Sequence, residues 1–358
     1  IKDVIPRFKT MQGYRCPRRW GWDCHGLPVE NEVEKELGFK SKKDIENYGI
    51  EKFNAKAKEA VMRYADDWRR YIERLGRWVD MDNDYRTMDS SYTESVWWSF
   101  KTLYDKGLIY EGFKSMHLCP RCETTLSNFE VTQGYKELTD TSVYVKFPLR
   151  GLANTYAIAW TTTPWTLPGN AALAVHPECD YAFVEITASN APEILTGDAF
   201  IVGAKEEILK RVFGKESFTF DPVSKVGSFV WKGAQVAFSA KKGMKGKELV
   251  GQSYEPLFDY YSRTQMNADS KPQTHADMSQ GWRVYGGEFV TEEDGTGIVH
   301  IAPAFGEDDY QLAVKEKLPF IQHVATDGIF KKEIADFAGL QAKPKGNPRE
   351  TDEKIIAL

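Results

Sequence analysis

The sequence is poor in cysteine and histidine, and it has no long apolar run. Five cysteines in 358 residues are an odd number for a framework of disulfides, so reduced thiols or metal ligands fit better. No apolar stretch approaches the roughly 20 residues that cross a bilayer. The N-terminus has neither an initiator methionine nor a signal-peptide pattern. These absences predict a chain, or part of one, that works in the cytoplasm and not in a membrane.

Basic side chains are fewer than acidic ones, 47 against 52, and the formal net charge is −5. This balance excludes a generally basic coat for nucleic acid but allows local basic patches. With 42% hydrophobic residues the chain can bury more than one core, and its length predicts two or three domains. Partners must therefore be inferred from individual sites.

The sequence also lacks a second Cys-x-x-Cys. Cys119-Pro120-Arg121-Cys122 has the spacing of one half of a tetrahedral zinc site, and a half-site cannot close by itself. The residues that could complete it have no paired spacing: Cys16, Cys24, His117, His176 and Cys179. The pair is therefore either half of a zinc site or two thiols at the surface.

One stretch is rich in hydroxyl groups. Residues 160–170 read Trp-Thr-Thr-Thr-Pro-Trp-Thr-Leu-Pro-Gly-Asn, and the apolar residues 155–160 before them predict a buried strand. Two prolines and a glycine then force a loop. The threonines of this loop, which we call the threonine loop, are expected to offer donors and acceptors to a polar ligand. They are Thr161, Thr162, Thr163 and Thr166. The alternative is that threonine simply favours strand ends.

A second stretch, residues 295–309, places His300 inside an apolar strand and Asp309 beyond a loop punctuated by proline and glycine. Taken with the threonine loop, it resembles the editing domain of the isoleucine-specific class I aminoacyl-tRNA synthetases. Valine- and leucine-specific relatives usually show Thr-Thr-Arg-Pro where this chain has Thr162-Thr163-Pro164-Trp165. The isoleucine branch is therefore the best match.

Residues 21–30 place Asp23, Cys24 and His25 next to one another between glycines. Adjacent side chains rarely bind one ion, so the residues alone suggest a polar loop. The segment resembles the one that follows the first catalytic signature of the isoleucine, valine and leucine enzymes, in which the aspartate matching Asp23 grips the amino group of the amino acid. The family's His-x-Gly-His and Lys-Met-Ser-Lys-Ser signatures are absent. The resemblance thus implies an incomplete ATP site and no charging of tRNA.

The expected fold class is α/β, with part of a Rossmann-like nucleotide-binding catalytic domain and an inserted editing domain rich in β-barrel structure. We expect the partial catalytic domain and the half zinc site in residues 1–138, the editing domain in 139–330, and a return linker in 331–358. Apolar periodicity predicts a helix over 51–75 and helices near 204–213 and 308–317. Residues 254–261 resemble a strand of the family, which implies a strand in the core rather than a platform for base stacking. A turn pattern predicts a hairpin through Asp294-Gly295 that joins strands 282–290 and 298–302.

The resemblance also implies roles for the site residues. Asp309 would hold the substrate ammonium and His300 would shape the pocket, while Thr161, Thr162 and Thr163 would position the ester, the adenosine and a water molecule. Thr166 and Asn170 would support the loop and the substrate. Cys119 and Cys122 would be zinc ligands of a longer parent. No Ser-His-Asp or Cys-His arrangement is evident in the sequence, so water is expected to attack the ester directly.

The resulting hypothesis is a fragment of an isoleucine-specific synthetase whose proofreading site hydrolyses mischarged Val-tRNA(Ile). The expected partners are the acceptor end of tRNA(Ile), isoleucine and valine, and the chain is expected to be monomeric. The alternatives are a free-standing aminoacyl-tRNA deacylase, which has no need of residues 21–30, and a non-catalytic module that binds tRNA or zinc. Four lysines among glycines could contact tRNA phosphates or form a solvated turn. They are Lys241, Lys242, Lys245 and Lys247.

Overall fold

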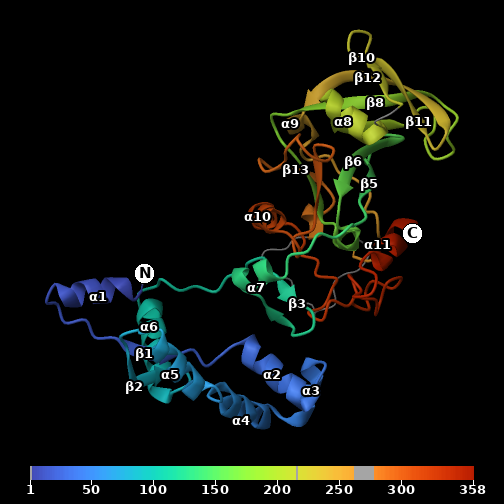
Figure 1. Ribbon diagram of the computed structural model, residues 1–358. Coiled ribbons are helices and arrows are strands. Elements are labelled where there is room, and N and C mark those ends of the chain that lie inside the picture. Colours follow the sequence, from blue (N-terminus) through green and yellow to red (C-terminus); the bar gives the residue numbers. More distant parts are fainter. Residues whose placement is uncertain (1, 215–216, 262–277) are drawn as a thin grey trace. The chain divides into compact units, whose positions relative to one another are not determined.

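The computed structural model describes residues 2–214, 217–261 and 278–358. The chain divides into two compact units, which are described separately (Figure 1). The first contains the residues up to Phe113 together with Arg121–Glu123, and the second contains Lys114–Pro120 and Thr124–Leu358. The predicted boundaries after residues 138 and 330 stay predictions. Within the described residues, no helix combines the length and the apolar character needed to cross a membrane.

The first unit consists of helices and a small parallel sheet. Its elements are α1 (Val4–Met11), β1 (Arg19–Trp22), α2 (Leu27–Leu37), α3 (Lys42–Tyr48), α4 (Ile50–Val61), α5 (Ala65–Arg74), β2 (Asp80–Arg86) and α6 (Ser90–Asp105). Strands β1 and β2 pair in parallel, with Gly21 opposite Tyr85. A Cβ at Gly21 would lie 2.3 Å from the Tyr85 ring, so a larger residue here would require the Tyr85 side chain to move.

The predicted single helix over 51–75 is wrong, because α4 ends at Val61 and α5 begins at Ala65. Apolar residues keep a helical period across the break, so periodicity alone does not reveal it. Asp66 and Asp67 in the first turn of α5 do mark it, since carboxylates favour the positive end of a helix dipole.

The second unit carries most of the strands. Its elements are β3 (Leu118–Cys119), β4 (Thr124–Thr125), α7 (Asn128–Gln133), β5 (Val143–Pro148), β6 (Thr155–Thr161), the 3-10 helix η1 (Pro164–Gly169), β7 (Ala172–Val175), β8 (Asp180–Ser189), β9 (Ala199–Gly203), α8 (Glu206–Phe213), β10 (Thr219–Asp221), β11 (Val226–Trp231), β12 (Ala234–Lys245), α9 (Gly246–Leu249), the 3-10 helix η2 (Met278–Gln280), β13 (Val284–Gly286), β14 (Ile298–Ile301), α10 (Glu307–Glu316) and α11 (Glu350–Ala357).

A seven-stranded sheet dominates this unit, in the order β10-β11-β12-β8-β9-β6-β5. Only the β6–β9 pair is parallel. Helix α8 lies against the sheet (Figure 1), and Phe213 at its end packs among Phe200, Phe229 and Phe238. The fold is therefore mixed α/β with a large multi-strand sheet, as predicted. The finer expectations of a Rossmann-like arrangement and a barrel stay predictions.

A three-stranded sheet in the order β13-β7-β14 carries His300. Strand β7 is buried along its whole length and pairs in parallel with β13 and antiparallel with β14. The predicted hairpin between 282–290 and 298–302 is therefore wrong, because β7 lies between the two strands. A local turn pattern cannot reveal a partner strand more than a hundred residues away. The predicted strand over 254–261 is also wrong, since Tyr254 forms only an isolated bridge with Leu149.

Residues 331–358 contribute side chains to a buried cluster near the threonine loop. Ile334, Phe337 and Ile355 pack there with Leu167 of η1 and with Phe330. Helix α11 contacts η1 directly. The segment that was expected to be a return linker therefore forms part of the scaffold around the threonines.

Candidate active site

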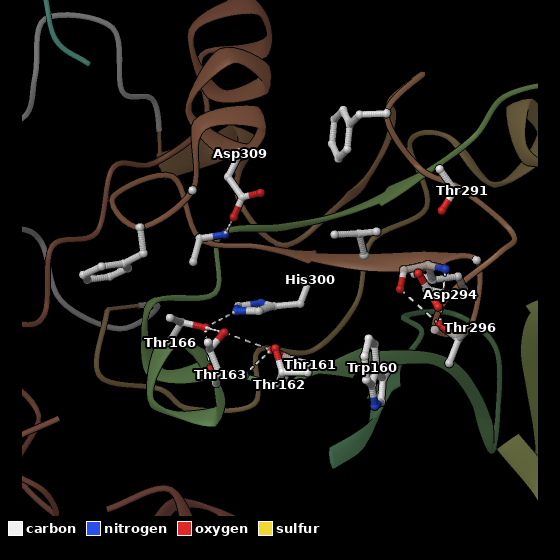
Figure 2. A pocket seen from close by; sticks show the side chains of 18 residues that line it. Trp160, Thr161, Thr162, Thr163, Thr166, Thr291, Asp294, Thr296, His300 and Asp309 are labelled. Carbon is white, nitrogen blue, oxygen red and sulfur yellow. Dashed lines mark hydrogen bonds between the residues drawn. The ribbon is translucent and has the colours of Figure 1, made fainter. Parts of the chain in front are cut away.

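The second unit contains a cavity of about 370 Å³ where several of its elements meet. The end of β6 and η1 form one wall, β14 and the loop before it form another, and the start of α10 closes one end (Figure 2). The lining residues are Trp160, Thr161, Thr162, Thr163, Thr166, Phe289, Thr291, Asp294, Gly295, Thr296, Gly297, Ile298, Val299, His300, Ala302, Phe305, Gly306 and Asp309. Residues predicted from two stretches 130 positions apart thus line one cavity.

The threonine loop is held by its own hydroxyl groups. Thr161 is buried at the end of β6, and its Oγ1 accepts a hydrogen bond from the Thr163 amide at 3.1 Å and lies 3.2 Å from the Thr163 hydroxyl. The Thr166 hydroxyl donates to the Thr163 carbonyl at 2.8 Å. Thr162 is exposed and lines the cavity. Of the three consecutive threonines, Thr162 therefore has the hydroxyl most open to a ligand.

His300 has a defined tautomer, because its neighbours fix the direction of each hydrogen bond. Tyr254 donates to Asn170 Oδ1 at 2.6 Å, and Asn170 Nδ2 donates to the Ala172 carbonyl at 3.0 Å. The same Nδ2 lies 2.8 Å from His300 Nδ1, which must therefore accept. Nε2 then carries the proton and donates to the Thr166 hydroxyl at 3.0 Å.

This network leaves His300 neutral and without a lone pair to offer the substrate. Burial, with a smaller effect of His323, lowers its pKa to about 3. At neutral pH the ring is therefore uncharged, its Nδ1 lone pair is occupied by Asn170, and its Nε2 proton is held by Thr166. His300 can shape the wall of the cavity but does not have the free nitrogen that a general base needs.

Asp309 closes the cavity from the third position of α10. Its Oδ2 accepts from the Ala302 amide at 2.8 Å, as Figure 2 shows. Burial raises the pKa of this carboxyl, the Ala302 hydrogen bond opposes that rise, and the nearby Asp308 adds to it. A half-buried carboxylate at the end of a cavity can bind a cationic group, whereas Asp308 is exposed and does not line the cavity.

The opposite end of the cavity carries residues that the sequence analysis did not assign to the site. Trp160 and Asp294 lie there, away from Asp309 (Figure 2). The loop that holds Asp294 is fixed by Arg211 of α8, whose guanidinium donates to the carbonyls of Gly295 at 2.8 Å and Glu293 at 2.7 Å. The Asp294-Gly295 turn before β14 was interpreted only as part of a hairpin, although it also places a carboxylate at this end of the cavity.

Asp23 is not among the residues that line this cavity. It follows β1 in the first unit and is exposed, and the residues that line the cavity all belong to the second unit. The predicted contact between Asp23 and an amino group stays a prediction.

Cys119 and Cys122 do not find further metal ligands in the described part of the chain. In residues 2–214, 217–261 and 278–358, no three histidine, cysteine, aspartate or glutamate side chains gather closely enough to hold a metal ion. A structural zinc ion needs four ligands, so the described residues do not fit one.

Three of the lysines that were considered for phosphate binding have acidic partners. Lys241 pairs with Glu185, Lys245 with Asp180 at 3.0 Å, and Lys247 with Glu178 at 3.8 Å. These pairs neutralise much of the local positive charge. They fit the solvated-turn interpretation better than a dedicated phosphate site.

Comparisons with known proteins agree on one family. Residues 1–334 match the family of class I tRNA synthetases for isoleucine, leucine, methionine and valine. An isoleucine--tRNA ligase of Treponema denticola is 43% identical over 362 residues, which is 96% of this chain and 30% of that protein. An isoleucine--tRNA ligase of Clostridium kluyveri is 42% identical over 357 residues, which is 100% of this chain and 29% of that protein. The chain thus spans about 30% of the length of these relatives.

Among solved structures, the cytosolic leucyl-tRNA synthetase editing domain of P. knowlesi matches with a TM-score of 0.32 and 13% identity. The match covers 49% of this chain and 64% of that one.

Proposed function

Because the chain belongs to the class I tRNA synthetases, we propose that it carries the proofreading site of an isoleucine enzyme and hydrolyses mischarged Val-tRNA(Ile). The observation that carries the proposal is the single cavity lined by the threonine loop, His300 and Asp309. A non-catalytic module would have no reason to gather hydroxyls and a half-buried carboxylate around one cavity. The volume, about 370 Å³, lies in the range of small-molecule sites.

Such a site compensates for the limited selectivity of a binding pocket between amino acids that differ only in size. A pocket that binds isoleucine can reject valine, one methylene smaller, only by about 10- to 200-fold, and isoleucyl-tRNA synthetase is itself the established example of this limit. A second site that accepts valine and excludes isoleucine removes the error by hydrolysis. In the proposed site, Asp309 binds the valine ammonium, and the neutral ring of His300 limits the space for the side chain.

The proposed hydrolysis is a direct attack by water. The water oxygen bonds to the ester carbonyl carbon, the bond from that carbon to the ribose oxygen breaks, and that oxygen leaves with a proton. The products are valine and a tRNA with a free terminal hydroxyl. Thr161, Thr162 and Thr163 orient the ester and the water, which lowers the entropic part of the barrier.

Mischarged Val-tRNA(Ile) and correctly charged Ile-tRNA(Ile) test this function. The chain is expected to accelerate hydrolysis of the valyl ester well above its spontaneous rate and to leave the isoleucyl ester nearly untouched. Equal rates with and without the protein would refute the proposal. We expect no isoleucine-dependent exchange of pyrophosphate into ATP, because the sequence lacks His-x-Gly-His and Lys-Met-Ser-Lys-Ser.

The wider setting belongs to the same proposal. A longer parent would join isoleucine to tRNA(Ile) with ATP, and Asp23 would contribute to its amino-acid site. Cys119 and Cys122 would bind zinc there together with ligands outside this sequence. The chain is proposed to act as a monomer in the cytoplasm on the acceptor end of the tRNA.

A further inference from the structure

The middle of the threonine loop is held by residues that come much later in the chain. Trp165 lies between Thr163 and Thr166, and both of its backbone polar groups bind buried side chains. Its amide donates to Asp352 Oδ1 at 2.9 Å, and its carbonyl lies 2.9 Å from His323 Nε2. Asp352 and His323 are both fully buried.

The Asp352 carboxylate is completely enclosed and has two kinds of partner. One oxygen accepts from the Trp165 amide, and the other accepts from Lys343 Nζ at 2.7 Å. Lys343 also donates to Asp140 at 2.7 Å. A buried carboxylate is costly unless it is paired and hydrogen-bonded, and Asp352 meets both conditions.

The first turn of η1 needs such a partner. The first amides of a helix have no acceptor within the helix, and a buried amide without a partner is unfavourable. Pro164 has no N–H, so Trp165 is the first residue of η1 whose amide needs an acceptor. No side-chain cap is provided by Thr163 at the N-cap position. Asp352, brought there by α11, supplies the missing acceptor.

We propose that Asp352 is a positioning residue of the editing site. Its carboxylate fixes the Trp165 peptide, and through it the positions of the Thr163 and Thr166 hydroxyls, which lie 3.5 Å apart on one wall of the cavity. The effect on hydrolysis rests on the function proposed above, whereas the effect on the loop does not. Asp352 is not among the residues that line the cavity, and its hydrogen bond to the threonine loop is to the backbone amide of Trp165.

Amide hydrogen exchange at Trp165, measured by NMR, tests the contact without any substrate. In Asp352→Ala the Trp165 amide should exchange about tenfold or more faster, because it loses an acceptor that carries a charge. Asp352→Asn keeps an acceptor oxygen and should restore most of the protection. Asp198→Ala is the matched control, since Asp198 is another buried aspartate that accepts a backbone amide, that of Leu195 at 2.9 Å. Asp198→Ala should leave the exchange rate of the Trp165 amide unchanged.

Hydrolysis of Val-tRNA(Ile) by the same variants tests the consequence. Asp352→Ala should lower kcat about tenfold or more with little change in KM, because small displacements of positioning groups are costly, and Asp352→Asn should recover most of the rate. Unchanged Trp165 exchange in Asp352→Ala would overturn the proposal. So would lost protection with an unchanged kcat, or an equal loss of kcat in Asp198→Ala. If the unaltered chain does not hydrolyse Val-tRNA(Ile), the proposed function fails, and the exchange data alone decide whether Asp352 fixes the loop.

Discussion

At the scale of single residues, Asp309 and Asp308 differ in their surroundings although they are adjacent. Asp309 lines the cavity and accepts from the Ala302 amide, while Asp308 is exposed. Asp309→Asn keeps an acceptor for Ala302 but removes the charge that binds an ammonium. Losing a charge-assisted contact worth about 1.5 to 3 kcal/mol should slow hydrolysis of Val-tRNA(Ile) about tenfold to a hundredfold.

Deacylation rates and thermal melting of Asp309→Asn and Asp308→Asn measure this difference. The melting temperature of Asp309→Asn should stay level or rise at neutral pH, because burial penalises the charged form of this carboxyl. Asp308→Asn should keep the rate of the unaltered chain. Equal rates in all three proteins would remove Asp309 from the site, and a large loss of melting temperature in Asp309→Asn would assign it to structure.

The sequence indicates which residues line the cavity but not what holds them. Thr162, His300 and Asp309 stand in short patterns whose residue types suit a polar ligand, and the structure brings them to one cavity. Tyr254 is buried, and its hydrogen bond to Asn170 is the contact that orients the amide beside His300. Asp352 lies 187 positions from Trp165. Contacts at such separations depend on the fold and leave no local pattern.

At the scale of elements, local periodicity predicts helices better than it predicts strand partners. The helices expected near 204–213 and 308–317 are confirmed as α8 and α10. The strand expected over 155–160 is confirmed as β6. Strand β7 instead separates two strands that were predicted to form a hairpin. A repeat of 3.6 residues is a property of one segment, whereas strand pairing joins segments that are distant in sequence.

The element that carries the cysteine pair yields a prediction about zinc. Cys119 ends β3, which pairs with β4, and the described residues supply no group of three potential ligands. Because a structural zinc ion requires four, the purified chain is expected to hold little zinc after mild chelation. Metal analysis of the unaltered chain and of Cys119→Ser should give the same low value. Stoichiometric zinc that survives chelation and disappears in Cys119→Ser would contradict this prediction.

At the scale of the whole molecule, two buried histidines should make stability depend on pH. Burial lowers the pKa of His300 to about 3 and that of His323 to about 4, against an ordinary value of 6.5. Between those values and 6.5 the folded chain binds fewer protons than the unfolded chain. The free energy of unfolding therefore rises with pH through this window and decreases as the pH is lowered. The slope is at most about 1.4 kcal/mol per pH unit for each histidine.

Asp309 should act in the opposite direction, and this difference makes the prediction testable. Because burial raises its pKa above the ordinary 3.8, the folded chain holds that proton more tightly, and the contribution of Asp309 to stability falls as the pH rises. Urea unfolding followed by circular dichroism between about pH 4 and pH 7 measures the slope. His300→Gln should flatten the rise of stability with pH, and Asp309→Asn should steepen it. Parallel curves for both variants and the unaltered chain would mean that neither group changes its proton affinity on folding. The inference that His300 is a neutral, enclosed ring in the wall of the cavity would then be wrong.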